Sequence, residues 1–152
     1  MRYWLVKADP SDISVDDLRN RSNGIIAWYG IRNYQSRNFM RDQMSVGDQI
    51  LFYHSSCKQP GIVGTAEVCK LAYPDSTQFD PNSKYFDLKA TSERPRWFNV
   101  DIKFVSKCQL ISIKELRSIP ALEGMRILQK GNRLSITPVD PAEWKHIIGI
   151  MR

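Results

Sequence analysis

Two long apolar runs joined by a turn constrain the fold more than any other feature of the chain. The runs are QILFYHS at residues 49–55 and GIVGTAEVCKLAY at residues 61–73, and they are joined by the turn-forming SCKQPG. Both runs are rich in β-branched and aromatic residues, which suit the pleated surface of a sheet. They therefore predict two consecutive strands.

The rest of the chain predicts more strands, with short helices placed irregularly among them. Further strands are expected at residues 3–8, 24–30, 84–89 and 96–111. Helices are expected at 14–21, 33–44, 112–119 and 140–150, with Ser14, Ser112 and Asp140 as N-caps. Residues 74–83 predict a loop, and residues 122–139 predict short helical turns and a connection.

This order of elements predicts one α+β domain spanning residues 1–152. Strands do not alternate regularly with helices, so a doubly wound parallel sheet is disfavoured. The chain is long enough to bury one core. We expect five or six strands to form a curved mixed sheet or a small β-barrel, with short helices around it.

Charge and cysteine content restrict the partners and the compartment. The net charge of +6 makes a polyanion a plausible partner, although a mildly basic housekeeping domain has the same charge. Three cysteines without a CxxC spacing argue against a disulfide framework and a structural zinc site. No apolar run approaches the roughly 18 residues of a membrane span. We expect an intracellular, cytoplasmic protein, or a nuclear one in a eukaryote, and a monomer.

Sequence motifs of catalysis are absent. The chain contains no GxxxxGK[ST], GxGxxG, HExxH or GxSxG pattern, and neither a metal nor a cofactor is predicted. His54 could activate Cys57 as a nucleophile with Lys58 nearby, because an adjacent cation lowers a thiol pKa. A polar turn with an incidental His and Cys explains the same residues more simply.

The helix expected at 33–44 has two different faces. Helical spacing places Tyr34, Arg37, Asn38 and Arg41 on one side. Phe39, Met40, Gln43 and Met44 lie on the other side. The arginines could contact phosphates, but a solvated basic face has the same pattern.

Tryptophan and lysine positions suggest where a ligand could bind. Trp4 and Trp144 lie in apolar patterns typical of core residues, whereas Trp28 and Trp97 stand beside glycine or arginine and could line a pocket. An aromatic ring that stacks on a base contributes about 1–3 kcal/mol. Lys7 interrupts an apolar strand, so its ammonium must reach the surface or an acceptor in a polar cavity.

Several longer blocks resemble the EVE domain family. They are YWLVKADP, WYGIRNYQSRNFMRD, GDQILFYHSSCKQPGIVGTAEV, DPNSKYFDLK, RPRWFNVDIKF and LSITPVDPAEW, and they extend from Tyr3 to Trp144. The resemblance implies a PUA-like fold, similar to YTH, ASCH and SRA-type domains. Such domains hold a pocket for one nucleobase, often a modified one, turned out of its strand.

The resemblance also implies which residues bind. The pocket residues would be Lys7, Ala8, Trp28, Tyr29, Asn33, Asn38, Tyr53, Ser55 and Trp97. YTH domains have a second cage tryptophan in a loop, and Tyr85, Phe86 or Trp97 would have to replace it here. Contacts to the nucleic-acid backbone would come from Arg32, Arg37, Arg41 and Lys58.

The expected function is therefore a non-catalytic module that holds a modified base of DNA or RNA beside a basic helix. The alternatives are a protein-interaction domain whose pocket is vestigial and a small enzyme acting on a modified nucleoside or nucleic acid, similar to ASCH hydrolases. That enzyme would rely on Lys7, Glu67 and the pair of His54 and Cys57.

Overall fold

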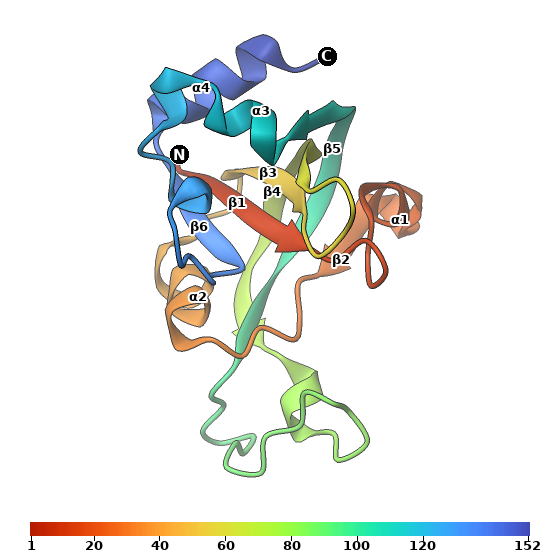
Figure 1. The fold of residues 1–152 in the computed structure, drawn as a ribbon. Coiled ribbons are helices and arrows are strands. Elements are labelled where there is room, and N and C mark those ends of the chain that lie inside the picture. The colour runs from red at the N-terminus through yellow and green to blue at the C-terminus, as the bar shows by residue number, and fades with distance from the viewer.

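The computed structural model describes residues 1–152, and a curved six-stranded mixed sheet forms its centre (Figure 1). The strands are β1 (Tyr3–Ala8), β2 (Ile25–Ala27), β3 (Gln49–His54), β4 (Gly61–Pro74), β5 (Phe98–Ser112) and β6 (Ile136–Val139). Their order across the sheet is β2-β5-β4-β3-β1-β6. Only β1 and β3 pair in parallel. The α+β class is confirmed, but the sheet is not closed, because β2 and β6 lie at opposite edges.

The two longest strands, β4 and β5, give the sheet its curvature. Their pairing contains four shifts of register, each of which bends and twists a ladder locally. At Gly64 a Cβ atom would lie 2.3 Å from the carbonyl oxygen of Ser106, so any side chain there would push the two strands apart. The strand ends remain paired through Tyr73 with Asn99 and Pro74 with Phe98.

Short helices cover both faces of the sheet. They are α1 (Val15–Asn20), α2 (Tyr34–Asn38), α3 (Ile113–Arg117) and α4 (Pro141–Ile150). The predicted capping residues Ser14, Ser112 and Asp140 are confirmed. The helix predicted at 33–44 is correct in position, but it changes at Phe39–Gln43 into a π-helical turn. None of the helices has the length and apolar content needed to cross a lipid bilayer.

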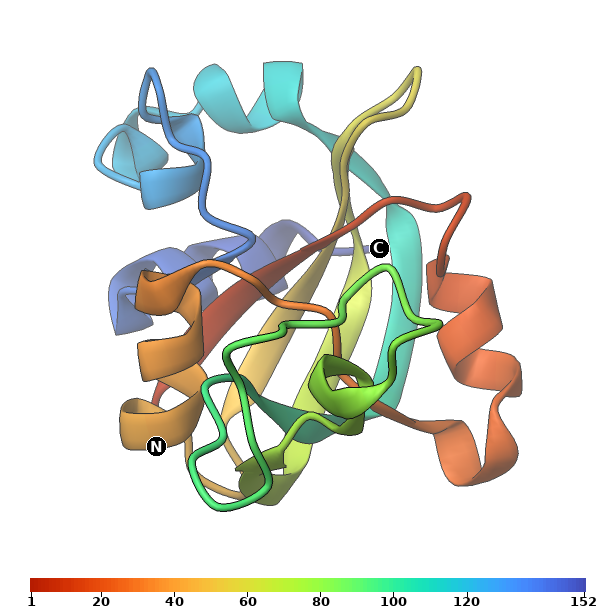
Figure 2. The ribbon, with the colours of Figure 1, turned by 90° about the horizontal axis from the view of Figure 1, so that it is seen from below.

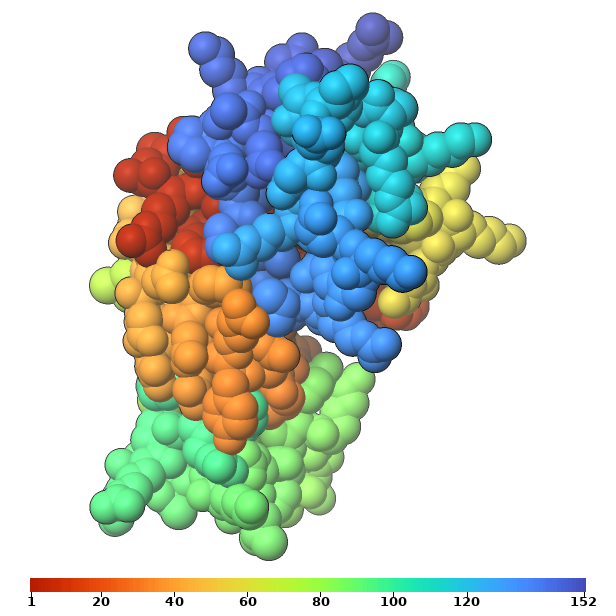
Figure 3. Space-filling model, turned by 60° about the vertical axis from the view of Figure 1, so that its left-hand side comes forward, coloured from red at the N-terminus to blue at the C-terminus, as the bar shows by residue number.

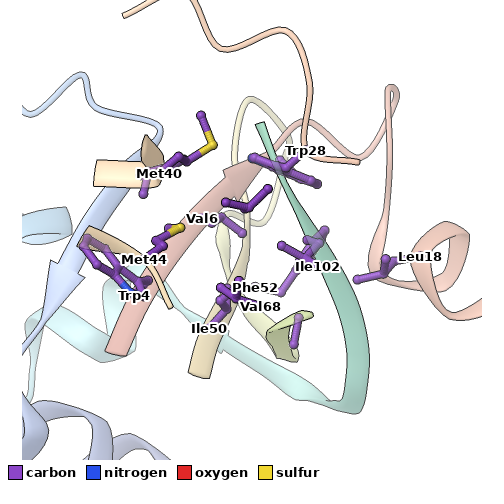
Figure 4. Close-up of a cluster of buried hydrophobic side chains, with 14 of the residues drawn as sticks. Trp4, Val6, Leu18, Trp28, Met40, Met44, Ile50, Phe52, Val68 and Ile102 are labelled. Atoms are coloured by element: carbon purple, nitrogen blue, oxygen red, sulfur yellow. The ribbon is translucent and has the colours of Figure 1, made fainter. Parts of the chain in front are cut away.

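Each face of the sheet buries its own core. Strand residues Trp4, Ile50 and Phe52 pack with Leu18 of α1 and with Met40 and Met44, which follow α2 (Figure 4). The other face carries Leu5 and Leu51, which pack against the layer of α3 and α4. The predicted core side of the 33–44 helix is confirmed for Phe39, Met40 and Met44, whereas Gln43 is exposed.

The loop at residues 75–97, which includes a 3₁₀ turn at Ser76–Phe79, projects beyond one end of the sheet (Figures 1 and 2). The buried side chain of Gln78 closes its neck, because Gln78 donates to the carbonyls of Asp75 and Trp97 and accepts from the N–H groups of Arg96 and Trp97. The two ends of the loop are therefore held together where β4 and β5 meet.

Three strand predictions were wrong in detail. Residues 84–89 form turns instead of a strand; the N–H groups of Phe86 and Asp87 donate to carbonyls within the loop, and Leu88 is 85% exposed. β6 was missed because Pro138 seemed to break the segment, yet a proline is tolerated in an edge strand. β2 ends at Ala27, so Trp28 lies beyond it.

Candidate functional site

A pocket of about 180 Å³ opens between the end of β1, the segment that follows β2 and the 75–97 loop. Four of the predicted residues line it, namely Lys7, Ala8, Trp28 and Tyr29. Tyr85, one of the three candidates for a second cage aromatic, also lines it, and Asp9, Asp12 and Arg21 add polar groups that the sequence did not indicate. The pocket thus combines three aromatic side chains with charged groups.

A wider hollow of about 650 Å³ lies at the other end of the molecule, between the end of β5, α3 and α4. Its charged and polar lining includes Glu115, His146 and Arg152, and it contains no Trp, Tyr or Phe. None of the predicted binding residues lies there. The smaller aromatic pocket is therefore the stronger candidate for binding a flat ligand.

Trp28 belongs both to the core and to the pocket. Its N–H donates to the carbonyl of Val100 at 2.8 Å, which continues the line of β2 past the end of that strand. Its ring meets Phe52 edge-on, with 5.8 Å between centroids, and only 7% of the residue is exposed. The core therefore holds one part of the indole rigidly, while another part remains open to the pocket.

Gly30 and Tyr85 shape the opposite wall. Gly30 has a φ of +84°, and a Cβ atom there would lie 2.7 Å from the Tyr85 ring, so the ring packs directly on the glycine. The edge of Tyr29 also meets Tyr85, with 5.9 Å between centroids. This close packing is possible only without a side chain at residue 30.

Asp75 holds this wall in place. The carboxylate is fully buried and accepts from the N–H of Gly30 at 2.8 Å, the N–H of Thr77 at 2.8 Å and the guanidinium of Arg32 at 3.1 Å. Burial alone would raise the pKa of Asp75, but these hydrogen bonds outweigh it and lower the pKa. Arg32 also donates to the carbonyl of Tyr85 at 2.8 and 3.1 Å. The ion pair of Asp75 and Arg32 thus joins the 75–97 loop to the segment that follows β2.

Lys7 is half-buried, and burial lowers the pKa of its ammonium group. It takes part in none of the ion pairs of the protein. Lys7 is therefore a cation in the pocket lining that forms no ion pair, although Asp9 and Asp12 line the same pocket.

The other predicted pocket residues do not line this pocket. They are Asn33, Asn38, Tyr53, Ser55 and Trp97. Asn33 caps α2 by accepting from the N–H of Ser36, and Asn38 accepts two hydrogen bonds from Arg37. Tyr53 is buried in the core on the α3 and α4 side.

Ser55 and Trp97 lie beside the pocket. The N–H of Ser55 donates to the carbonyl of Ala8 at 2.9 Å, which extends the pairing of β1 and β3. Trp97 is buried, its indole N–H donates to Asp87 at 2.8 Å, and its ring stacks on Tyr34. Both residues support neighbouring segments and do not face the pocket.

The four cations predicted to meet phosphates have different surroundings. Arg32 is engaged by Asp75, Thr77 and Tyr85, and Arg41 pairs with Asp42 at 2.8 Å. Arg37 bonds only neutral acceptors, namely Asn38 and the carbonyl of Arg96. Lys58 is exposed in the turn between β3 and β4. Arg37 is thus the one arginine of the three whose charge has no acid partner.

His54, Cys57 and Lys58 line one open hollow, but no hydrogen bond joins His54 to Cys57. His54 Nε2 accepts from the N–H of Val15 at 3.1 Å, which ties the end of β3 to the first residue of α1. Burial lowers the pKa of His54, although Asp16 and Asp17 act in the other direction. The lone pair that a general base would use is therefore already engaged.

This contact predicts a loss of stability in weak acid. The folded protein has a His54 pKa below the ordinary value of 6.5, so the unfolded chain binds the extra proton first. His54 therefore stabilises the fold fully above pH 6.5, and this contribution should decrease as the pH falls from there through its folded pKa. Urea unfolding at pH 7.5, 6.5 and 5.5 measures the change. His54→Gln should show a smaller decrease, and equal decreases in the two proteins would contradict the assignment.

The family of the chain follows from comparison with known proteins. The family model of the EVE domain matches residues 2–150. The chain belongs to the EVE domain family. Thymocyte nuclear protein 1 from Gallus gallus is 36% identical over 97% of this chain and 68% of its own length.

Two solved structures show the same EVE domain fold. A protein from Pseudomonas putida has a TM-score of 0.92 and 43% identity, covering 97% of both chains. The human THYN1 protein, solved in complex with DNA that contains 5-methylcytosine, has a TM-score of 0.92 and 35% identity, covering 98% of this chain and 96% of its own. An EVE domain protein of this fold thus binds nucleic acid.

Proposed function

We propose that this EVE domain binds nucleic acid and holds one modified base, 5-methylcytosine or a close analogue, in the pocket between Trp28 and Tyr85. The observation that carries the proposal is the meeting of Trp28, Tyr29 and Tyr85 in one pocket. A solved structure of a human relative in complex with DNA that contains 5-methylcytosine also supports the proposal. The role of the domain would be recognition and not catalysis.

The volume of the pocket suits one base. About 180 Å³ equals the liquid volume of about six water molecules and is well below the roughly 300–1,000 Å³ of pockets for drug-sized ligands. A base fits this space, whereas its sugar and phosphate must remain outside. Lys7, as a cation without an acid partner, would donate to an acceptor on the ligand.

Stacking on the aromatic walls is needed to offset the free-energy cost of turning a base out of a duplex. Turning a base out of a duplex costs a few kcal/mol, and less at an unpaired site. Stacking on an aromatic ring contributes about 1–3 kcal/mol, so two walls can offset the cost. A buried methyl group adds only about 0.8 kcal/mol, which corresponds to roughly fourfold in affinity. The walls would thus supply most of the binding free energy and the methyl contact a modest preference.

Titration of a short single-stranded DNA with one 5-methylcytosine tests the proposal. We expect the tryptophan fluorescence to change, because Trp28 lines the pocket, and we expect roughly fourfold tighter binding than for the unmodified strand. Equal affinity for the two strands would refute the proposal that the domain recognises the methyl group. No binding of either strand would refute the pocket assignment.

Arg37 would provide affinity that does not depend on sequence. Its guanidinium has five N–H donors, of which Asn38 and the carbonyl of Arg96 engage three, so two remain for a phosphate. Arg37→Ala should weaken modified and unmodified strands alike and reduce the slope of log affinity against log salt by about one.

The control for Arg37 is Lys145→Ala, which removes one exposed charge from α4 at the far end of the molecule. It should leave the slope unchanged. If both variants change the slope equally, the effect reports net charge and Arg37 contacts no phosphate.

The enzymatic alternative is the weaker one, because the hollow that His54 shares with Cys57 offers no base free to activate the thiol. His54 is engaged by Val15, and Glu67 faces Lys103 across the β4–β5 ladder. A monomeric state and a location inside the cell, in the nucleus of a eukaryote, remain part of the proposal.

A further inference from the structure

A second aromatic surface lies next to the pocket, where α2 meets the end of the 75–97 loop. Tyr34 stacks on Trp97 with 4.8 Å between ring centroids and 25° between the ring planes. Tyr34 is 47% exposed, whereas Trp97 beneath it is buried and fixed by its hydrogen bond to Asp87. In Figure 3, α2 (orange) and the loop (green) form one continuous surface. A rigidly supported tyrosine face is therefore open to a ligand.

Guanidinium groups surround this tyrosine. The Arg37 Cζ atom lies 4.6 Å from the ring centroid of Tyr34 and 5.8 Å from that of Trp97. A group on the outer face of Tyr34 would lie much farther from Trp97, so Arg37 stands beside the stack and does not cover it. The Arg96 Cζ atom lies 6.0 Å from the Tyr34 centroid. The open ring is thus bordered by cations, which suits a flat group attached to an anionic chain.

The stack is directly linked to the pocket. The Arg32 Cζ atom lies 5.5 Å from the ring of Tyr85, which lines the pocket, and 5.3 Å from the ring of Trp97. The segment from Trp28 to Tyr34 also runs without interruption from the pocket to α2. Arg32 and this segment therefore connect the stack of Tyr34 and Trp97 to the pocket.

We propose that Tyr34 is a second stacking site, which receives the unpaired base next to the one held in the pocket. This inference rests on the proposed function, and it adds that the ligand is a strand unpaired at two neighbouring positions. The phosphate between the two bases would lie near Arg37, whose two unused N–H groups can bind it. The occupant is a nucleobase because any base offers a π-face and its strand carries the charge that the arginines attract.

The test compares four ligands with the wild-type protein, Tyr34→Ala and Tyr34→Phe. The ligands are a single-stranded DNA with one 5-methylcytosine, the same strand with an abasic site on one or the other side of it, and free 5-methyl-2′-deoxycytidine. Tyr34→Ala should bind the intact strand roughly 5- to 150-fold more weakly, while Tyr34→Phe, which keeps the ring, should match the wild type.

The two abasic strands and the nucleoside distinguish stacking on Tyr34 from an indirect effect on the pocket. With the abasic site on the side that faces Tyr34, the wild type should lose its advantage over Tyr34→Ala. The free nucleoside occupies only the pocket, so it should bind both proteins equally. The inference is overturned if neither abasic strand removes the difference, or if Tyr34→Ala weakens the nucleoside as much as the strand.

The experiment gives different results if this inference fails and if the proposed function fails. If the wild type binds the strand and the nucleoside but Tyr34→Ala changes neither, the pocket stands and the second site is refuted. If the wild type binds no ligand at all, both are refuted. Melting curves of the three proteins verify that the loss in Tyr34→Ala is not unfolding.

Discussion

Asp75→Ala should lower the free energy of unfolding by about 3 kcal/mol and abolish binding of a base. Removing one partner of a buried ion pair costs about 3–5 kcal/mol, and the lower end applies because 22% of the Arg32 side chain remains exposed. The variant also leaves the N–H groups of Gly30 and Thr77 without their acceptor. For a chain of 152 residues this corresponds to a melting temperature lower by about 6–12 °C.

Binding should be lost even below the melting temperature of the variant. Without Asp75, the N–H of Gly30 loses its acceptor in the 75–97 loop, and Arg32 keeps only its bonds to Thr77 and Tyr85. The packing of the Tyr85 ring on Gly30 should therefore loosen. Calorimetric melting and titration with the methylated strand measure the two effects.

Two comparison variants isolate the role of Asp75. Asp75→Asn keeps one oxygen acceptor but removes the charge, so its loss of stability should be intermediate. Asp16→Ala breaks an exposed pair with Lys107 at 2.9 Å, which is worth less than about 1 kcal/mol. A loss in Asp75→Ala no larger than that in Asp16→Ala would contradict its role as the centre of the wall.

Tyr85→Ala should weaken binding of the methylated strand roughly 5- to 150-fold while the protein stays folded. The ring supplies one wall of the pocket, and stacking on it contributes about 1–3 kcal/mol. Tyr85 is only half-buried and lies in the loop, outside both cores, so its removal should disturb the sheet little. Fluorescence titration gives the affinity, and far-ultraviolet circular dichroism monitors the fold.

The neighbouring residue provides a matched control. Phe86 is exposed and does not line the pocket, so Phe86→Ala should bind like the wild type. Tyr85→Phe keeps the ring and should retain most of the affinity. Equal losses of affinity in Tyr85→Ala and Phe86→Ala would show that any change in the loop weakens binding and that the Tyr85 ring does not contact the base. Trp28→Ala is a poorer test, because truncating this core residue costs about 3–5 kcal/mol of stability.

Local patterns predicted the fold well. The N-caps Ser14, Ser112 and Asp140 and the central strands depend on neighbouring residues, and the sequence shows these directly. The run at 84–89 contains the aromatic and apolar residues of a strand, but no other strand pairs with it, and composition alone cannot supply hydrogen-bond partners.

Only some residues of the candidate pocket were predicted, because its geometry depends on contacts between residues that are distant in the sequence. Lys7, Ala8, Trp28 and Tyr29 were grouped through a family resemblance, and the structure brings them to one pocket. Asp75 was not indicated, because its partner Gly30 is 45 residues away and nothing in the sequence marks the pair.

The arginines show a second limit of sequence reasoning. Helical spacing placed Arg37 and Arg41 on one face, but the π-helical turn at Phe39–Gln43 has more residues per turn, so that spacing does not hold through Arg41. Arg41 pairs with Asp42 instead. A basic face inferred from periodicity therefore overstated the number of cations without an acid partner.

The closed neck of the 75–97 loop has a consequence for how such domains diversify. Gln78 and the pairing of Pro74 with Phe98 complete the sheet without help from residues 80–95. Insertions, deletions and substitutions in that stretch should leave the strand register intact, yet Tyr85 within it lines the pocket. If the pocket binds a base as proposed, exchanging this one loop should change the ligand preference on an unchanged scaffold, in evolution as in engineering.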